Sequence, residues 1–188
     1  TRDAFATRGH NAWSCDLKPS KRPGQHWQGS WRDIDWSFFD LLIAHPECTH
    51  LAVSGAAHFA AKRADGRQQA AIEEFMWLAN APVPMKCIEN PVCIMSTLYR
   101  KPDQIIQPHQ FGHPEFKATC YWLTGLPKLI PTNPLPIPER GTPEWRAWER
   151  KHRLGPSPDR AEKRSESFAN VSEAMADQWG RIAARAVA

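Results

Sequence analysis

The sequence predicts an α/β fold, with a mainly parallel sheet and helices on both of its faces. Two apolar runs, at 38–44 and 85–88, read as buried strands, and 67–78 between them carries apolar residues at helical spacing. Alternation of strand, helix and strand is typical of parallel sheets, because the chain must cross back before it can start a parallel neighbour. The 188 residues are enough for one such domain with a sizeable core.

The first elements of the chain are short. A helix is expected at 2–8 and ends at Gly9, since glycine readily takes the left-handed conformation that closes a helix. A strand at 12–15 follows and ends at Asp16. The next segment, 18–29, combines proline, glycine and basic residues, and we expect it to be a loop.

The second half of the chain holds most of its 17 prolines, which indicates many loops. The elements expected there are two strands, a short helix and a final helix, at 104–107, 119–123, 143–151 and 171–186. The apolar face of the final helix is formed by Ala174, Met175, Trp179 and Ile182. The predicted organisation is a core at 1–125, a proline-rich, basic segment at 126–165 and a helix within 166–188 that packs back on the core.

Composition limits the class of protein. No apolar stretch reaches the roughly 18 residues of a membrane span, and no signal peptide pattern opens the sequence, so a cytoplasmic protein is expected. A formal net charge of +4 leans toward a polyanionic partner. Five scattered cysteines without a C-x-x-C pair indicate reduced thiols. His109 and His113 lie in a loop without the spacing of a zinc site, so no metal is expected.

The most informative residues follow the two buried strands. Ala-His-Pro-Glu-Cys-Thr-His at 44–50 follows the first strand, and Ile-Glu-Asn-Pro-Val at 88–92 ends the second. In an open α/β sheet, catalytic groups gather at such carboxyl ends of strands. A thiol from Cys48 and a carboxyl from Glu89 are what an enzyme needs to attack C6 of a pyrimidine and to protonate N3.

Both residues also have a simpler interpretation. Cys48 as a nucleophile needs a lowered pKa, for which His45, His50 and Lys86 are the electropositive neighbours in the sequence. Otherwise it is a small buried hydrophobic residue. Glu89 in a buried position is expected to have a raised pKa, which suits proton donation. Otherwise it is a structural carboxylate.

These two motifs resemble the Pro-Cys and Glu-Asn-Val motifs of DNA cytosine-5 methyltransferases. They are most similar to the compact phage and prophage branch, which carries His-Pro-Pro-Cys-Thr and Glu-Asn-Pro-Val. The resemblance implies a Rossmann-like methyltransferase fold, S-adenosylmethionine as cofactor and double-stranded DNA as partner, with the target cytosine flipped out of the duplex. It assigns Cys48 as nucleophile and Glu89 as the acid, with Asn90 bracing the loop. Glu47 stands where the family has proline, and a carboxylate there raises the thiol pKa.

The resemblance also implies residues for the cofactor. Asp16 ends a strand where nucleotide-binding folds place an acidic residue against ribose hydroxyls. Ser30 replaces a carboxylate of the relatives, for which Asp33 or Asp35 can substitute. The remaining residues that the resemblance assigns to the cofactor are Pro46, Asn170 and Val171.

Target recognition is implied for a further set of residues. Arg100 lies where larger enzymes of the family carry a Gln-x-Arg-x-Arg motif, and we expect it in the catalytic site. His113 and Lys117 are expected to contact DNA phosphate. A basic patch that contains Arg146, Arg150, Lys151 and Arg153 is the predicted DNA-facing surface. A solvated charged face is the alternative for these residues.

The resemblance also implies a strand and a glycine loop ahead of the helix at 2–8, and the sequence given holds neither. We therefore expect the first strand of the fold to be missing from it. Two alternatives to the methyltransferase remain open. One is a catalytically silent DNA-binding or interaction protein that keeps the scaffold. The other is a pyrimidine-C5 enzyme that acts on nucleotides.

Overall fold

The computed structural model describes residues 1–149, 154, 155, 157 and 167–186 of the chain. Its helices are α1 (Arg2–Ala6), α2 (Phe59–Ala64), α3 (Arg67–Ala79), α4 (Met95–Leu98), α5 (Pro143–Trp148) and α7 (Ala169–Ala186). Its strands are β1 (Ser14–Asp16), β2 (His26–Gln28), β3 (Leu41–Ala44), β4 (Met85–Pro91), β5 (Gln104–Ile106) and β6 (Thr119–Thr124). Four short 3₁₀ helices lie at Trp31–Asp33, Trp36–Phe38, Val53–His58 and Pro108–Gln110.

The strands form two sheets. The larger has four strands in the order β3-β4-β6-β5, and β1 pairs with β2 in a separate parallel pair. Strands β3 and β4 are parallel, with Ala44 opposite Ile88. Strand β6 is antiparallel to both β4 and β5. The carboxyl ends of β3, β4 and β5 therefore lie at one edge of the sheet, and β6 begins there.

The structure mixes helices and strands and is compatible with the expected α/β class, but the expectation of a mainly parallel sheet was wrong. Only β3 and β4 pair in parallel within the larger sheet. The segment 107–118, which joins β5 to β6, holds one 3₁₀ helix and no crossover helix, so the chain turns back and β6 runs antiparallel. Of the other elements, the helix at 67–78 is confirmed as α3. The loop expected at 18–29 contains the short strand β2.

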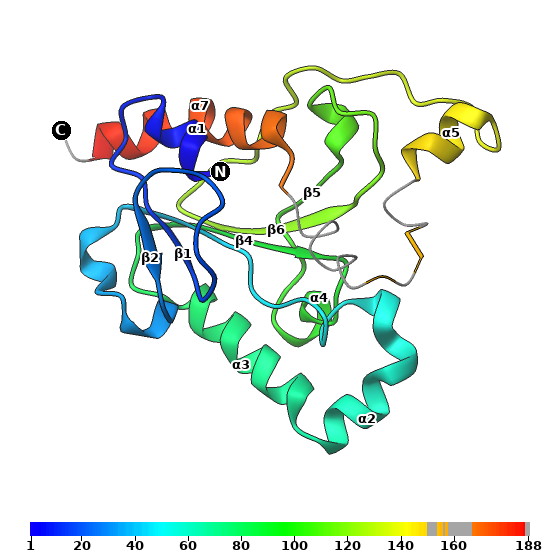
Figure 1. Ribbon diagram of the computed structural model, residues 1–188, viewed down its shortest axis with the longest axis horizontal. Coiled ribbons are helices and arrows are strands. Elements are labelled where there is room, and N and C mark those ends of the chain that lie inside the picture. The colour runs from blue at the N-terminus through cyan, green and yellow to red at the C-terminus, as the bar shows by residue number, and fades with distance from the viewer. Residues whose placement is uncertain (150–153, 156, 158–166, 187–188) are drawn as a thin grey trace.

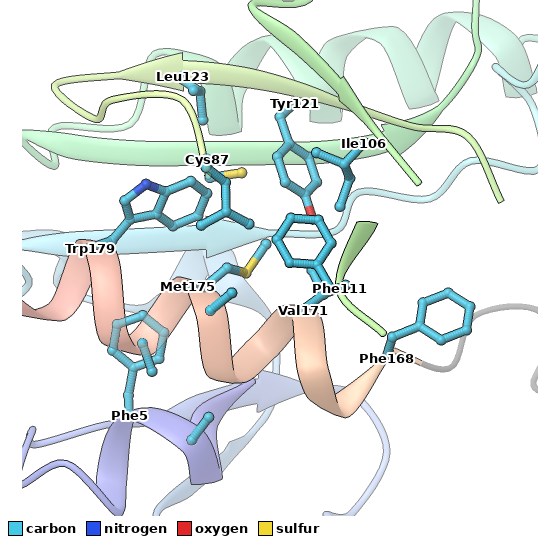
Figure 2. Packing of buried hydrophobic residues seen from close by; sticks show 14 residues of the cluster. Phe5, Cys87, Ile106, Phe111, Tyr121, Leu123, Phe168, Val171, Met175 and Trp179 are labelled. Carbon is cyan, nitrogen blue, oxygen red and sulfur yellow. The ribbon is translucent and has the colours of Figure 1, made fainter. Parts of the chain in front are cut away.

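Helices cover both faces of the larger sheet, as expected: α1 and α7 lie together on one face and α3 lies on the other (Figure 1). The alternation of side chains along the strands separates two cores. Figure 2 shows the first, in which Cys87 and Tyr121 of the sheet pack with Met175 and Trp179 of α7. The second joins Trp122 and its neighbours to α3.

Helix α7 packs on α1, so residues from the start of the sequence contact residues of α7. The hydroxyls of Thr1 and Ser172 lie 3.1 Å apart, and Arg8 forms an ion pair with Glu173. Gly180 permits the close approach, because a Cβ there would lie 2.5 Å from a ring nitrogen of His10. Among the described helices, none has both the length and the apolar character needed to cross a membrane.

Two glutamines attach the described part of the proline-rich segment to this core. The side-chain amide of Gln104 both donates to and accepts from the backbone of Leu129, at 2.7 Å in each case. Gln178 on α7 does the same with Ile130, at 2.9 and 2.8 Å. Leu129 is itself buried in the first core. Residues 129 and 130 are thus held against the sheet and α7.

Candidate active site

The two sequence motifs meet at the carboxyl edge of the sheet. The parallel register of β3 and β4 places the segment after Ala44 beside the end of β4. Beyond the strands, the two segments stay paired: Val53 N donates to the Val92 carbonyl, and Ile94 N donates to the Leu51 carbonyl, both at 3.1 Å. The loop that carries Cys48 is therefore fixed beside the strand that carries Glu89.

Three buried side chains from three different elements hold the Cys48 loop, residues 45–50, by its carbonyl oxygens. Asn90 of β4 donates to Pro46 at 3.1 Å, Lys62 of α2 to Thr49 at 2.6 Å, and Gln68 of α3 to His50 at 3.0 Å. All three donors are less than 9% exposed. Hydrogen bonds protected from water in this way fix the path of the loop.

The Cys48 thiol is half-buried, and its electrostatic surroundings are mixed. Burial and the neighbouring Glu47 carboxylate raise the pKa of Cys48, and Glu89 adds to this, while Lys117 opposes it. The expectation that the Glu47 carboxylate raises the pKa of Cys48 is therefore confirmed. The expectation for Lys86 was wrong, because its ammonium is buried and donates to the Ala81 carbonyl at 2.8 Å.

Glu89 is paired with His45. Nδ1 of His45 lies 2.5 Å from Oε2 of Glu89, and the Glu89 side chain is 18% exposed. Burial alone would raise the pKa of Glu89, but the charge and hydrogen bond of His45, together with the charge of Lys117, lower it. The raised pKa expected from sequence was therefore wrong, because the partner of the carboxyl lies 44 residues earlier and outweighs burial.

Lys117 lies closer to this chemistry than the sequence indicated. It precedes β6 by two residues, at the edge of the sheet where β4 ends, and its charge acts on both Cys48 and Glu89. Its backbone N–H donates to the Gln107 side chain at 2.9 Å, and its ammonium lies 5.5 Å from the ring centre of Phe168. Only the antiparallel direction of β6 brings it here, and no sequence pattern indicated that direction.

Arg100 is placed away from this site, against expectation. Its guanidinium bonds to the Asp103 carboxylate at 2.6 Å and to the Leu123 carbonyl at 2.9 Å. Leu123 pairs with Cys87, toward the start of β4, whereas Cys48 lies beyond its end. Arg100 therefore stabilises the far end of β6. It does not belong to the constellation of Cys48, Glu89, His45 and Lys117.

The residues expected to face DNA fall into two groups. His113, on the segment between β5 and β6, is half-buried beside Phe168, with 4.6 Å between ring centres. Arg146 is exposed on α5, which packs through Trp145 on Phe116 of the same segment. Both thus belong to the edge where β4 and β5 end. Arg150, Lys151 and Arg153 lie outside the described residues.

The residues expected to hold the cofactor do not form one group. Asp16 and Asp33 are exposed, and both act on Cys15 near the small sheet. Pro46 is buried and its carbonyl is used by Asn90. Asn170 is exposed at the start of α7, but Val171 is buried in the first core. Val171 is therefore unable to face a ligand, since its side chain fills the core.

Two surface hollows of the described chain lie elsewhere. One is lined by residues of α2, α3 and α4 that include Arg63, Ile72 and Leu98, and the other lies beside the end of α3 at Trp77. Neither hollow includes Cys48 or Glu89. Comparison of this chain with protein-family models, with curated proteins and with solved structures found no match in any of the three.

Proposed function

We propose that this chain is a DNA cytosine-5 methyltransferase, in which Cys48 adds to C6 of cytosine and Glu89 assists protonation of the ring nitrogen N3. One observation carries the proposal: the parallel register of β3 and β4 puts the loop of Cys48 and the strand of Glu89 at one sheet edge. S-adenosylmethionine would supply the methyl group, and double-stranded DNA would present a flipped cytosine.

Each residue has a role that its contacts support. Cys48 supplies the nucleophile, and Lys117 opposes the rise in its pKa caused by burial and Glu47. Asn90 holds the Pro46 carbonyl, and so keeps the thiol loop in place relative to β4. Positioning of this kind accelerates addition because the reacting groups no longer need to be brought together.

The residues assigned to S-adenosylmethionine do not fit around one ligand. Val171 is buried in the core, while Asp16 and Asp33 are exposed near the small sheet. These residues therefore support no step that passes through the methyl donor. The chemistry derived from the described residues is the addition of the thiolate to the ring and the transfer of a proton to N3.

The test uses duplex DNA that contains 5-fluorocytosine, incubated with the protein and S-adenosylmethionine and followed by intact-mass analysis. Fluorine replaces the proton that must leave C5, so the covalent protein–DNA species cannot resolve. We expect an adduct that is lost in Cys48→Ser. Cys15→Ser is the matched control, because Cys15 is exposed on the small sheet and should leave the adduct unchanged.

A catalytically silent, DNA-binding scaffold is the second candidate, and the surroundings of Cys48 favour it. Burial and Glu47 both raise the pKa of this thiol, which lowers the fraction of reactive thiolate. A folded wild-type protein that binds the duplex but forms no adduct would support the scaffold. The same result would contradict the methyltransferase.

A further inference from the structure

The histidine that follows β3 belongs to the same constellation as Glu89. Nδ1 of His45 is in direct contact with Oε2 of Glu89, the arrangement of a charge-assisted hydrogen bond. The His45 side chain is 41% exposed, whereas that of Glu89 is 18% exposed. The pair thus has one end in contact with solvent and the other facing the interior of the site.

The proposed addition needs a proton that Glu89 alone does not hold. When a thiolate adds to C6, the π electrons of the C5–C6 double bond shift toward C4. The π electrons of the C4–N3 double bond then move onto N3. That nitrogen must then be protonated. With its pKa lowered below the ordinary value of 4.5, the Glu89 carboxyl is ionised at neutral pH. It accepts a hydrogen bond in that form and has no proton to give.

The other titratable groups that act on Glu89 do not change this. Burial raises the pKa of Cys87 and of Tyr121 well above their ordinary values, so both stay neutral near pH 7. Lys117 contributes a positive charge, and Cys48 is the nucleophile itself. Of the groups in the described chain that act on Glu89, His45 bonds to the carboxyl directly through a ring nitrogen, and its exposed ring can exchange a proton with solvent.

We propose that His45 is a positioning residue that supplies the proton for N3 through Glu89, an inference that rests on the proposed function. The Cys48 thiolate forms the sulfur–C6 bond, N3 gains one proton and the His45 imidazolium loses one. The Glu89 carboxyl is a carboxylate before and after the step. The negative charge of the thiolate and the positive charge of the imidazolium disappear together, so the charge balances. Solvent restores the proton at the exposed ring of His45.

The experiment measures the rate of adduct formation, by intact mass, with duplex DNA that carries one pyrimidin-2-one in place of cytosine. This base lacks the 4-amino group, and a thiolate can add to its C6 without a methyl donor. Rates are measured from pH 5 to 9 for the wild type, His45→Gln, Glu89→Gln and the double variant. His58→Gln is the control, because His58 is exposed on a 3₁₀ helix and has no assigned role.

His45→Gln can still donate a hydrogen bond but carries no titratable proton. We expect its rate at pH 7 to fall by at least about tenfold, as loss of a proton donor does. The pH profile of the His45→Gln rate should also differ from that of the wild type, because the variant has no titratable group at this position. His58→Gln should keep both the rate and the profile of the wild type. The double variant should be no slower than Glu89→Gln, since the proton passes through Glu89.

Three results would overturn the inference. A His45→Gln rate and profile equal to the wild type would show that the pair carries no proton to the base. If the double variant forms the adduct more slowly than Glu89→Gln, by the same factor that His45→Gln alone causes, then His45 acts independently of Glu89. A wild type that forms no adduct dependent on Cys48 would remove the proposed function itself, and the inference with it.

Discussion

The side-chain amide of Asn90 donates a hydrogen bond across 3.1 Å to the main-chain carbonyl of Pro46, 44 residues earlier in the chain. This bond links the two motifs that the sequence placed after separate strands. Asn90 is 1% exposed, so water does not compete for the bond. With Lys62 and Gln68, it makes the Cys48 loop part of the rigid sheet edge, because each donor belongs to a different regular element.

The contribution of Gln68 can be tested against its neighbour. Gln68→Ala leaves the His50 carbonyl without its partner and should lower the free energy of unfolding by about 1–3 kcal/mol. Hydrogen exchange at 48–52 should become faster. Gln69→Ala is the matched control, because Gln69 is exposed and its side-chain amide donates to Glu73 on the same helix. Its effect in urea unfolding should stay within about 0.5 kcal/mol, and equal effects would contradict the role of Gln68.

Removal of the charge at Glu47 should make Cys48 more reactive. Burial and the Glu47 carboxylate raise the pKa of Cys48, so Glu47→Gln should lower that pKa and increase the thiolate fraction at a given pH. The alkylation rate of Cys48 by iodoacetamide at pH 8, followed by peptide mass spectrometry, should rise several-fold. Glu73→Gln, an exposed change on α3, should leave the rate as it is. A slower reaction in Glu47→Gln would contradict this account.

Glu89 should make the protein sensitive to acid. Its folded pKa lies below the ordinary 4.5, so the ionised carboxyl stabilises the fold above pH 4.5, and this stabilisation is lost as the pH falls through the folded pKa. Urea unfolding at pH 6 and pH 3.5 should show a larger loss for the wild type than for Glu89→Gln. Glu74→Gln, a change at a half-buried position on α3, should follow the wild type. Equal losses for the wild type and Glu89→Gln would refute the pairing.

Trp179 should be the largest single contributor from α7. It is fully buried between α7 and the sheet, and its ring N–H donates to the Pro127 carbonyl at 3.0 Å. Trp179→Ala should cost about 3–5 kcal/mol in urea unfolding, as expected for a cavity of that size. Trp13→Ala removes a side chain that is 47% exposed and should cost less than about 1 kcal/mol. Similar midpoints for both variants would contradict the packing of α7.

Much of the fold could be predicted because its signals are local. Spacing of apolar residues located α3, and buried runs located β3 and β4, since burial leaves its pattern in consecutive residues. Strand direction leaves no such pattern. The run at 119–124 is apolar on both faces and reads the same either way, so the antiparallel placement of β6 was not predicted. Strand β2 was missed because its side chains are mostly exposed.

The candidate site could be predicted only in outline. The strand ends located Cys48 and Glu89, because parallel strands end at the same edge. The charges around them depend on residues brought together by folding. His45 follows β3 and contacts Glu89 on the neighbouring strand β4. Lys117 acts on Cys48 and Glu89 only because β6 starts at that edge. The direction of the Glu89 pKa therefore could not be obtained from its own neighbours in the sequence.

The pairing of α1 with α7 has a consequence for the nascent chain. The contacts from Thr1 to Ser172 and from Arg8 to Glu173 span 171 and 165 residues. One apolar face of the sheet therefore remains uncovered on the ribosome until α7 has been synthesised. Closure of so long a loop is slow, and an open apolar face is the surface that chaperones bind. Completion of this core therefore follows translation of α7.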